Sequence, residues 1–220
     1  MQESQRIQKL VSVLNKTYAS QKLGLRRSNP IQLLVAVILS AQCTDIRVNQ
    51  VTESLFKKYK TAKDFASANS KIFEKEIFST GFYKNKAKNI RAACKIIYEQ
   101  HNGKLPNTMP ELLNFPGVAR KTANVVLGEV FGQVEGFVVD THVKRLSQRM
   151  GLTQNVNPEK IEKDLMQKIS PKDWWNFSTA LILHGRKICQ ARKPRCLECP
   201  VQKLCPSAVV FFPELKLAKQ

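Results

Sequence analysis

The chain has 220 residues, of which 43% are hydrophobic, so it is long enough to bury a core and is not a disordered chain. Its 36 Lys and Arg residues outnumber its 17 acidic residues, and the formal net charge of +19 favours a polyanionic partner, nucleic acid before an anionic membrane. A lysine-rich bias of the source organism would give the same excess. No apolar stretch approaches the roughly 18 residues of a membrane span, and no secretory signal is visible, so we expect a cytosolic protein without a membrane segment.

Apolar residues recur at helical spacing along most of the chain, and capping residues precede several of these segments. Asn29 and Pro30 suit the N-cap and the first position of a helix, and the same pair recurs at Asn157 and Pro158. Thr44 and Ser70 can cap two more helices. The helices that we predict lie at residues 7–14, 31–39, 45–55, 71–77, 90–97, 110–115, 120–131, 158–165 and 173–187.

Only residues 136–139 have strand character, and this run is too short to build a sheet. The sequence therefore predicts an all-α fold with two helical lobes. We expect one helical domain at residues 23–134, and a second that combines residues 1–22 with residues 135–220.

A short turn joins two of the predicted helices at Pro116, Gly117, Val118 and Ala119. The N–H groups at the start of the next helix lack intrahelical partners, and with the helix dipole they can bind a DNA phosphate without reading sequence. An ordinary helical hairpin gives the same pattern. Lys121 lies just beyond the turn, where its amine can act as a nucleophile or be one more surface lysine.

Asp140 ends the apolar run at residues 137–139. Its carboxylate can activate an amine or stabilise a developing cation. It can also cap a helix that begins at Thr141, and it could fill both roles. His142 can assist Asp140 or be a structural histidine with its hydrogen bonds satisfied.

Four of the six cysteines have the spacing C-x6-C-x2-C-x5-C. In a cytosolic chain such a group indicates a metal rather than disulfides. Cys189, Cys196, Cys199 and Cys205 can hold a [4Fe–4S] cluster. A structural zinc site is the alternative, although zinc usually takes two short Cys knuckles and this segment has one.

Three segments resemble motifs of the endonuclease III family of DNA glycosylases. Residues 115–122 resemble its helix-hairpin-helix, residues 138–143 its segment with the catalytic aspartate, and residues 39–45 its Leu-Ser-Ala-Gln-x-Thr-Asp motif. The cysteine spacing equals the iron–sulfur pattern of the family, and the resemblance extends from about residue 7 to residue 206. Ala119 departs from it, because the family usually has a second Gly there; if that position needs a positive φ, Ala would be strained by about 1–2 kcal/mol.

The resemblance implies a catalytic pair, a cofactor and a set of DNA contacts. Lys121 would be the nucleophile and Asp140 its helper, and a C-terminal loop would hold a [4Fe–4S] cluster. Gln42 would enter the duplex, and Phe82 would act as an apolar wedge where the family more often has Leu, although both could instead pack on the protein. The remaining contacts would be the turn residues Gly117, Val118 and Ala119 and the basic loop residues Lys187, Arg192, Lys193 and Arg195, for which a solvated charge run is the alternative.

The function that the resemblance implies is base-excision repair. The chain would be a bifunctional DNA glycosylase and AP lyase that removes oxidised pyrimidines from damaged double-stranded DNA through a Lys121 Schiff base and cuts 3′ to the lesion by β-elimination. We expect a monomer in the cytoplasm, nucleoid-associated if the source is bacterial. One alternative is a related glycosylase of different base specificity, such as the adenine-specific one, which generally lacks the hairpin lysine. Another is a non-catalytic DNA-binding module with a structural four-cysteine metal site.

Overall fold

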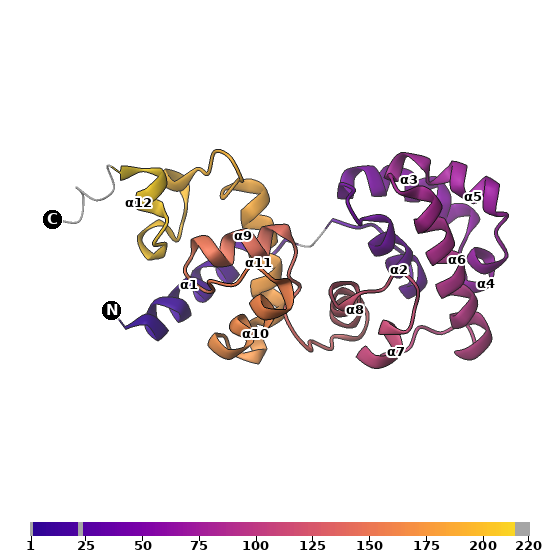
Figure 1. Cartoon of the computed structure of the whole chain (residues 1–220), viewed down its shortest axis with the longest axis horizontal. Helices are drawn as coiled ribbons and strands as arrows, with labels where there is room; N and C mark the ends of the chain where they lie inside the picture. The colour runs from indigo at the N-terminus through magenta and orange to yellow at the C-terminus, as the bar shows by residue number, and fades with distance from the viewer. Residues whose placement is uncertain (1, 22–23, 214–220) are drawn as a thin grey trace. The chain divides into compact units, whose positions relative to one another are not determined.

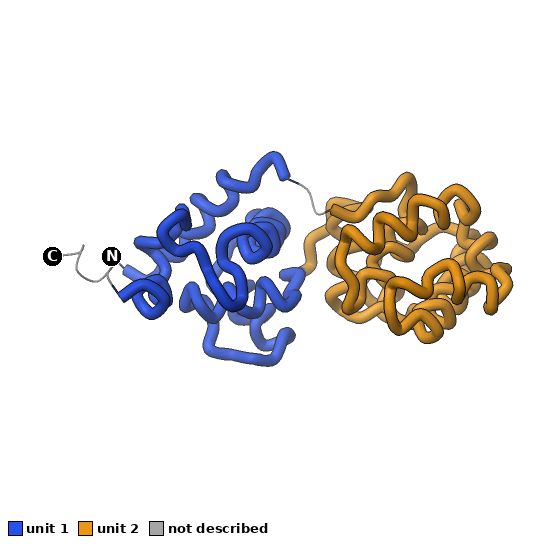
Figure 2. The backbone as a smooth tube through the Cα atoms, turned by 90° about the horizontal axis from the view of Figure 1, so that it is seen from above, with its two compact units in different colours: residues 1–23, 136–220 blue, residues 24–135 orange. Residues whose placement is uncertain are grey.

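The chain folds into two compact helical units. The computed structural model describes residues 2–21 and 24–213. Unit 1 is discontinuous and combines Met1–Leu23 with Gly136–Gln220, whereas unit 2 is the continuous segment Gly24–Glu135 (Figure 2). All regular elements in the described ranges are helical, so the predicted all-α fold with two helical lobes is confirmed. Residues 136–139 form no strand within the described part of the chain, and their strand character is not realised.

Unit 2 contains α2 to α8 (Figure 1). A 3-10 turn at Phe78–Thr80 precedes α6, and a π-helical segment at Leu127–Phe131 continues α8. The helices are α2 (Pro30–Leu39), α3 (Asp45–Lys58), α4 (Ala62–Ser67), α5 (Ser70–Glu76), α6 (Tyr83–Gln100), α7 (Met109–Leu113) and α8 (Arg120–Val126).

Unit 1 combines the first helix with the C-terminal helices. Short 3-10 turns at Pro171–Asp173, Cys196–Glu198 and Gln202–Leu204 connect or follow them. The helices are α1 (Glu3–Tyr18), α9 (Thr141–Arg149), α10 (Pro158–Lys168), α11 (Trp174–Lys187) and α12 (Ala208–Phe211).

Helix α2 is the centre of unit 2. Nine of its ten residues are buried, and α3, α6 and α8 pack against it. Leu34 and Val35 have no exposed surface. Complete burial of a side chain of this size is worth about 1.5–3 kcal/mol, so the surrounding helices stabilise α2 by covering its apolar side chains.

Aromatic side chains fill the space between α3, α4 and α5. The ring of Phe65 stacks on Tyr59 at 5.3 Å between centroids and meets Phe73 edge to face at 6.1 Å. Such pairs stabilise by about 0.5–1.5 kcal/mol beyond the area that they bury. This cluster fixes α4, which the apolar spacing did not predict.

In unit 1 the core lies between α11 and two other helices, α1 and α9. Leu10 and Leu14 on α1 and Leu181 on α11 are fully buried. Phe137, in the extended segment before α9, meets Phe177 of α11 edge to face at 6.3 Å. The extended segment is therefore fixed to α11 at the point where it leads to Asp140.

Several predicted helix starts are confirmed by the caps. Asn29, Thr44 and Asn157 each accept hydrogen bonds from backbone N–H groups in the first turn of α2, α3 and α10. The expected cap at Ser70 was wrong by one residue, because the side chain of Asn69 accepts from Ile72 N and Ser70 is the first helical residue. Both residue types can cap, and the spacing could not choose between them.

The turn between α7 and α8 depends on Gly117. Its φ is +79°, in the left-handed region that L residues with a Cβ rarely adopt. A Cβ at this position would also lie 2.9 Å from Cβ of Asn89 on α6. The turn therefore needs glycine for two reasons, its backbone conformation and the close approach of α6.

We predict that Gly117→Ala destabilises unit 2 by more than the conformational penalty alone. The left-handed conformation costs Ala about 1–2 kcal/mol, and overpacking typically adds about 1–3 kcal/mol. Urea denaturation followed by far-UV circular dichroism measures the loss.

Gly132→Ala is the matched control. Gly132 has φ +66° and nothing within 4 Å of an added Cβ, so this variant should show the conformational penalty only. Equal losses in the two variants would mean that the contact with Asn89 imposes no constraint.

Candidate catalytic residues and iron–sulfur loop

Lys121 is exposed in the first turn of α8. It is the second residue of the helix and directly follows the turn that contains Gly117. The residues after it, at positions 123–127, are buried, so the helix is anchored in the core of unit 2 while the amine stays in solvent. An amine in this position is accessible to a large substrate.

The turn before Lys121 resolves the expectation about Ala119. Ala119 has φ −92° and ψ 170°, an extended conformation that any L residue adopts. The strain that a positive φ would have caused is absent at this residue, and only Gly117 in the turn needs the left-handed region. Val118 is buried, and its N–H already donates to Phe115 O at 3.0 Å.

Asp140 is the N-cap of α9. Its Oδ1 accepts hydrogen bonds from the N–H groups of His142 and Val143, each at 2.8 Å. Its Oδ2 lies 2.9 Å from Nδ1 of His142, and 13% of the Asp140 side chain is exposed. Three contacts thus hold the carboxylate in place. The prediction that Asp140 caps a helix beginning at Thr141 is confirmed.

Ser178 helps to hold the segment that leads to Asp140. The N–H of Val138 donates to Ser178 Oγ at 3.2 Å, and both residues are buried. This contact satisfies a backbone donor that a neighbouring strand would satisfy in a sheet. Sequence reasoning missed Ser178, which lies 40 residues further along the chain and belongs to no motif.

Gln42 and Phe82 are both exposed in unit 2, on turns that precede α3 and α6. Both have a positive φ, +53° for Gln42 and +47° for Phe82. Non-glycine residues in this conformation are uncommon and cluster at functional sites. Phe82 has 63% of its surface exposed, and Gln42 is exposed as well.

The four cysteines of the loop surround one hollow. Cys189, Cys196, Cys199 and Cys205 line one space, together with Ile188, Pro194 and Ala208. Within residues 2–21 and 24–213 no three side chains of the metal-binding types converge as the ligands of a single ion would. Four thiols spread around a hollow suit the donor set of an iron–sulfur cluster.

Burial sets the chemistry of these thiols. It raises the pKa of Cys196 and Cys205, and it raises the pKa of Cys199 to about 12. A thiolate in such a place requires a compensating positive charge. Iron ions supply that charge when a cluster is bound, so the residues fit the group.

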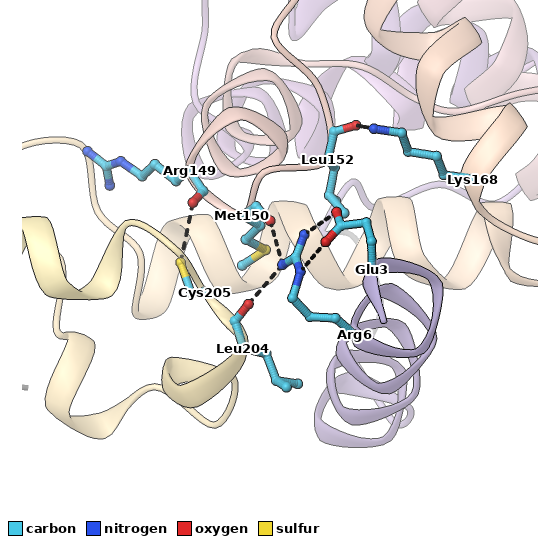
Figure 3. A network of polar contacts seen from close by, with 8 residues as sticks. All are labelled: Glu3, Arg6, Arg149, Met150, Leu152, Lys168, Leu204 and Cys205. Carbon is cyan, nitrogen blue, oxygen red and sulfur yellow. Dashed lines mark hydrogen bonds and ion pairs between the residues drawn. The ribbon is translucent and has the colours of Figure 1, made fainter. Parts of the chain in front are cut away.

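Arginine side chains from outside the loop hold it in shape. Arg149 of α9 donates from Nη1 to Cys189 Sγ at 3.4 Å and to Gln190 O at 2.8 Å, and from Nη2 to Ala191 O at 2.7 Å. Arg6 of α1 donates from Nη1 to Met150 O at 2.9 Å and to Leu204 O at 2.8 Å (Figure 3). Arg6 thereby connects α1, the end of α9 and the segment just before Cys205.

A buried histidine contacts another cysteine. The hydroxyl of Tyr18 lies 2.9 Å from Nδ1 of His184, and Nε2 of His184 lies 3.4 Å from Cys199 Sγ. Burial lowers the pKa of His184 to about 4, so the ring is neutral near pH 7. If the hydroxyl donates to Nδ1, the proton of the neutral ring is on Nε2 and faces the sulfur. Neither residue belonged to a motif that the sequence singled out.

The basic residues of the loop divide into two kinds. Lys187 donates to Gln21 Oε1 at 2.6 Å, and Arg195 donates to Lys187 O at 2.7 Å and pairs with Glu198 at 3.2 Å. Arg192 and Lys193 are exposed and make no side-chain hydrogen bond or ion pair with any residue that the structure describes. Of the four basic residues that the sequence analysis assigned to this loop, Arg192 and Lys193 are therefore the two with no intramolecular partner in that part of the chain.

No helix in the described ranges combines the length and apolar character needed to cross a bilayer.

Comparisons with known proteins extend over nearly the whole chain. Residues 35–171 match the model of the HhH-GPD superfamily base excision DNA repair proteins, and residues 189–205 match the iron–sulfur binding domain of endonuclease III. The endonuclease III of Synechocystis sp. is 53% identical over 206 residues, which are 94% of each chain. The prediction of a [4Fe–4S] cofactor is thereby confirmed.

Two solved structures have the same fold. A non-covalent endonuclease III–DNA complex has a TM-score of 0.89 at 38% identity and covers 100% of both chains. A trapped covalent endonuclease III–DNA intermediate has a TM-score of 0.89 at 40% identity over 94% of this chain and 98% of the other. With these relatives and the superfamily match, the chain belongs to the endonuclease III family within the HhH-GPD superfamily of base excision DNA repair proteins.

Proposed function

We propose that this chain removes oxidised pyrimidines from double-stranded DNA and cuts the strand 3′ to the lesion, with Lys121 as the nucleophile and Asp140 as its helper. The enzyme is a bifunctional DNA glycosylase and AP lyase of base excision repair. The observation that carries the assignment of Lys121 is its exposed amine on the first turn of α8, in a chain 40% identical to an endonuclease III trapped covalently on DNA.

The chemistry follows from an amine nucleophile. Neutral Nζ of Lys121 attacks C1′ of the damaged nucleotide, and the bond between C1′ and the base breaks with its electrons leaving on the base, which takes up a proton. The sugar opens to a Schiff base with Lys121. Loss of a C2′ proton then expels the 3′ phosphate by β-elimination, and water releases the enzyme.

Asp140 supplies a fixed negative charge for this reaction. Because three contacts hold its carboxylate, it needs little reorganisation when positive charge develops on the sugar. It is also the group that we propose to accept the proton of Lys121. Capping α9 and assisting catalysis are compatible, since a carboxylate can accept hydrogen bonds and still carry its charge.

We further propose that Gln42 and Phe82 enter the duplex when the damaged nucleotide is extruded. An amide can take over hydrogen bonds in the vacated space, and an aromatic ring can wedge between base pairs. The exposure of both side chains supports this role. Backbone groups around Gly117 and Ala119, with Val118 as the spacer between them, are proposed to meet the phosphates.

The cluster loop is proposed to contact the DNA backbone. Cys189, Cys196, Cys199 and Cys205 would hold the [4Fe–4S] cluster, whose iron–thiolate bonds cross-link the loop when it is bound. Arg192 and Lys193 would supply the phosphate contacts, and Lys187 and Arg195 would support them through their own hydrogen bonds within unit 1. We also propose that the enzyme is a monomer in the cytoplasm, nucleoid-associated if the source is bacterial.

The first prediction concerns the Schiff base. Borohydride reduces a Schiff base to a stable amine, so wild-type protein should form a covalent complex with a thymine-glycol or abasic duplex. Lys121→Gln should abolish this complex and leave DNA binding nearly unchanged, as measured by gel analysis and fluorescence anisotropy.

Lys71→Gln is the matched control for Lys121→Gln. Lys71 is also an exposed lysine at the second position of a helix of unit 2, α5, and its replacement should leave trapping intact. Undiminished trapping by Lys121→Gln would remove Lys121 from the role.

The second prediction separates the two roles of Asp140. Asp140→Asn keeps an oxygen that can accept from His142 N and Val143 N but removes the charge. We expect the single-turnover rate constant to fall by on the order of 10²-fold or more, with the unfolding midpoint nearly unchanged.

Asn157→Ala serves as the comparison for Asp140→Asn. It deletes the cap of α10, where the Asn157 side chain accepts from two backbone N–H groups, and should cost about 0.5–2 kcal/mol of stability without loss of activity. A fully active Asp140→Asn enzyme would show that Asp140 is only a cap.

The third prediction concerns the basic loop. Each phosphate contact contributes roughly −0.9 to the slope of log K against log salt concentration. Replacing Arg192 and Lys193 together by Ala should make this slope shallower by about two units and weaken binding to damaged and undamaged duplexes by similar factors.

Replacing Lys160 and Lys163 by Ala removes the same charge from α10 of unit 1, and the slope should stay close to that of the wild type. If the loop variant kept the wild-type slope too, Arg192 and Lys193 would not touch phosphate.

A further inference from the structure

Lys86 is a buried lysine with a specific set of contacts. Only 5% of its surface is exposed, and Nζ donates to Leu39 O and to Thr80 O, each at 2.8 Å. Burial lowers the pKa of Lys86 below its ordinary value. Because an ammonium group is costly to remove from water, it is retained in such a place only when its hydrogen bonds are made.

The two carbonyl groups belong to segments far apart in the sequence. Leu39 is the last residue of α2 and leads to the turn at residues 40–43, which we call the Gln42 turn. Thr80 ends the 3-10 segment before α6 and begins residues 80–82, which we call the Phe82 turn. Lys86, one turn into α6, therefore holds the base of each turn with one ammonium group.

Each turn is otherwise closed by its own backbone. Cys43 N donates to Ser40 O at 3.1 Å, and Gly81 N donates to Phe78 O at 3.3 Å. Among the residues that the structure describes, no hydrogen bond joins residues 39–43 directly to residues 78–82. Lys86 is thus the polar connection between two turns that both present an exposed side chain from a left-handed backbone.

We propose that Lys86 is a positioning residue that couples the Gln42 turn to the Phe82 turn, so that Gln42 and Phe82 enter the duplex as one rigid unit. This inference rests on the proposed function, in which these two residues fill and wedge the duplex. Extrusion of a nucleotide requires both actions at the same time, because a vacated space that is wedged but not filled lets the nucleotide return.

Helix α6 is held in place on both sides of Lys86, which suits it to this task. The ring of its first residue, Tyr83, contacts the ring of Phe78 in a tilted arrangement, with 4.8 Å between the centroids. Asn89, one turn after Lys86, lies against Gly117 of the hairpin. A shift of the ammonium group would move both turns relative to this anchor, and the left-handed backbone at Gln42 and Phe82 needs a surrounding structure that determines it.

The wild-type protein offers a first test that needs no substitution. Native-state hydrogen exchange measures the opening of the hydrogen-bonded amides of Ala41 and Cys43 in one turn and of Thr80 and Gly81 in the other. Coupled turns should open in one transition, with the same denaturant dependence and with protection equal within about tenfold. Two turns that open in separate transitions would overturn the proposal.

The second test uses Lys86→Met, which keeps the length of the side chain and removes its charge and donors. Excision of a paired oxidised base in a single turnover should slow by roughly 10–100-fold, since small displacements of positioning groups have effects of this size. Cleavage at a preformed abasic site, where no base has to be unstacked, should stay within about threefold of the wild type. Fluorescence of 2-aminopurine opposite the lesion should report less opening.

Two further variants make the result specific. Lys86→Arg restores a cation with several donors and should recover most of the excision rate. Lys168→Met removes a similar contact in unit 1, where Nζ donates to Leu152 O at 2.7 Å, and should affect neither activity (Figure 3). Equal losses of excision and abasic-site cleavage in Lys86→Met would indicate general damage and overturn the coupling, as would excision at the wild-type rate.

The outcomes distinguish this proposal from the proposed function. A wild-type protein that neither excises bases nor cleaves abasic sites would refute the function, whereas the exchange test of the two turns would still decide whether Lys86 couples them. An active enzyme whose turns open independently would refute the coupling alone.

Discussion

The burial of residues 31–39 of α2 is the constraint on which unit 2 depends. A helix buried over nearly its whole length also buries polar groups at or near its ends, and each buried donor or acceptor there needs a partner. At the N-terminal end, Asn29 accepts from Gln32 N, and the buried side chain of Gln32 bonds to Ser28 N and to Phe56 O. At the C-terminal end, the ammonium group of Lys86 donates a hydrogen bond to Leu39 O. The turn that carries Gln42 thus begins at a helix end that the core has already fixed.

Local features of the fold could be predicted from sequence, because caps and apolar spacing act over a few residues. The starts of α2, α3 and α10 at Asn29, Thr44 and Asn157 are examples. Helix α4 was missed although Thr61 and Asp64 form a capping box, since its six residues are too few to show a period. The run before Asp140 was assigned strand character because its apolar residues suit a strand. A backbone N–H of this extended run, that of Val138, instead donates to Ser178 Oγ. A contact between residues so far apart in the sequence cannot be predicted from a local pattern.

The candidate site divides in the same way. The cysteine spacing was sufficient for the iron–sulfur prediction, because all four ligands lie in one short loop. The side chains that brace this loop come from elsewhere: Arg149 is 40 residues from Cys189, and Arg6 is 198 residues from Leu204. In a chain with 36 basic residues, the sequence does not distinguish these arginines from solvent-exposed ones, because their hydrogen-bond partners are brought near only by folding. Lys86 was overlooked for the same reason, and its burial could not be read from a helix that also carries exposed lysines.

The bracing of the loop by Arg6 has a consequence for how the protein is made. Helix α1 leaves the ribosome before α11, against which it packs, and before the carbonyls of Met150 and Leu204 that its arginine bonds. Unit 2 is continuous and can fold in the meantime, as domains do during synthesis at about 5–20 residues per second. For on the order of ten to thirty seconds, the apolar face of α1 is therefore without its partners. Helix α1 is therefore packed only after α11 has emerged, and the loop that Arg6 braces takes its final shape only after Leu204 has followed.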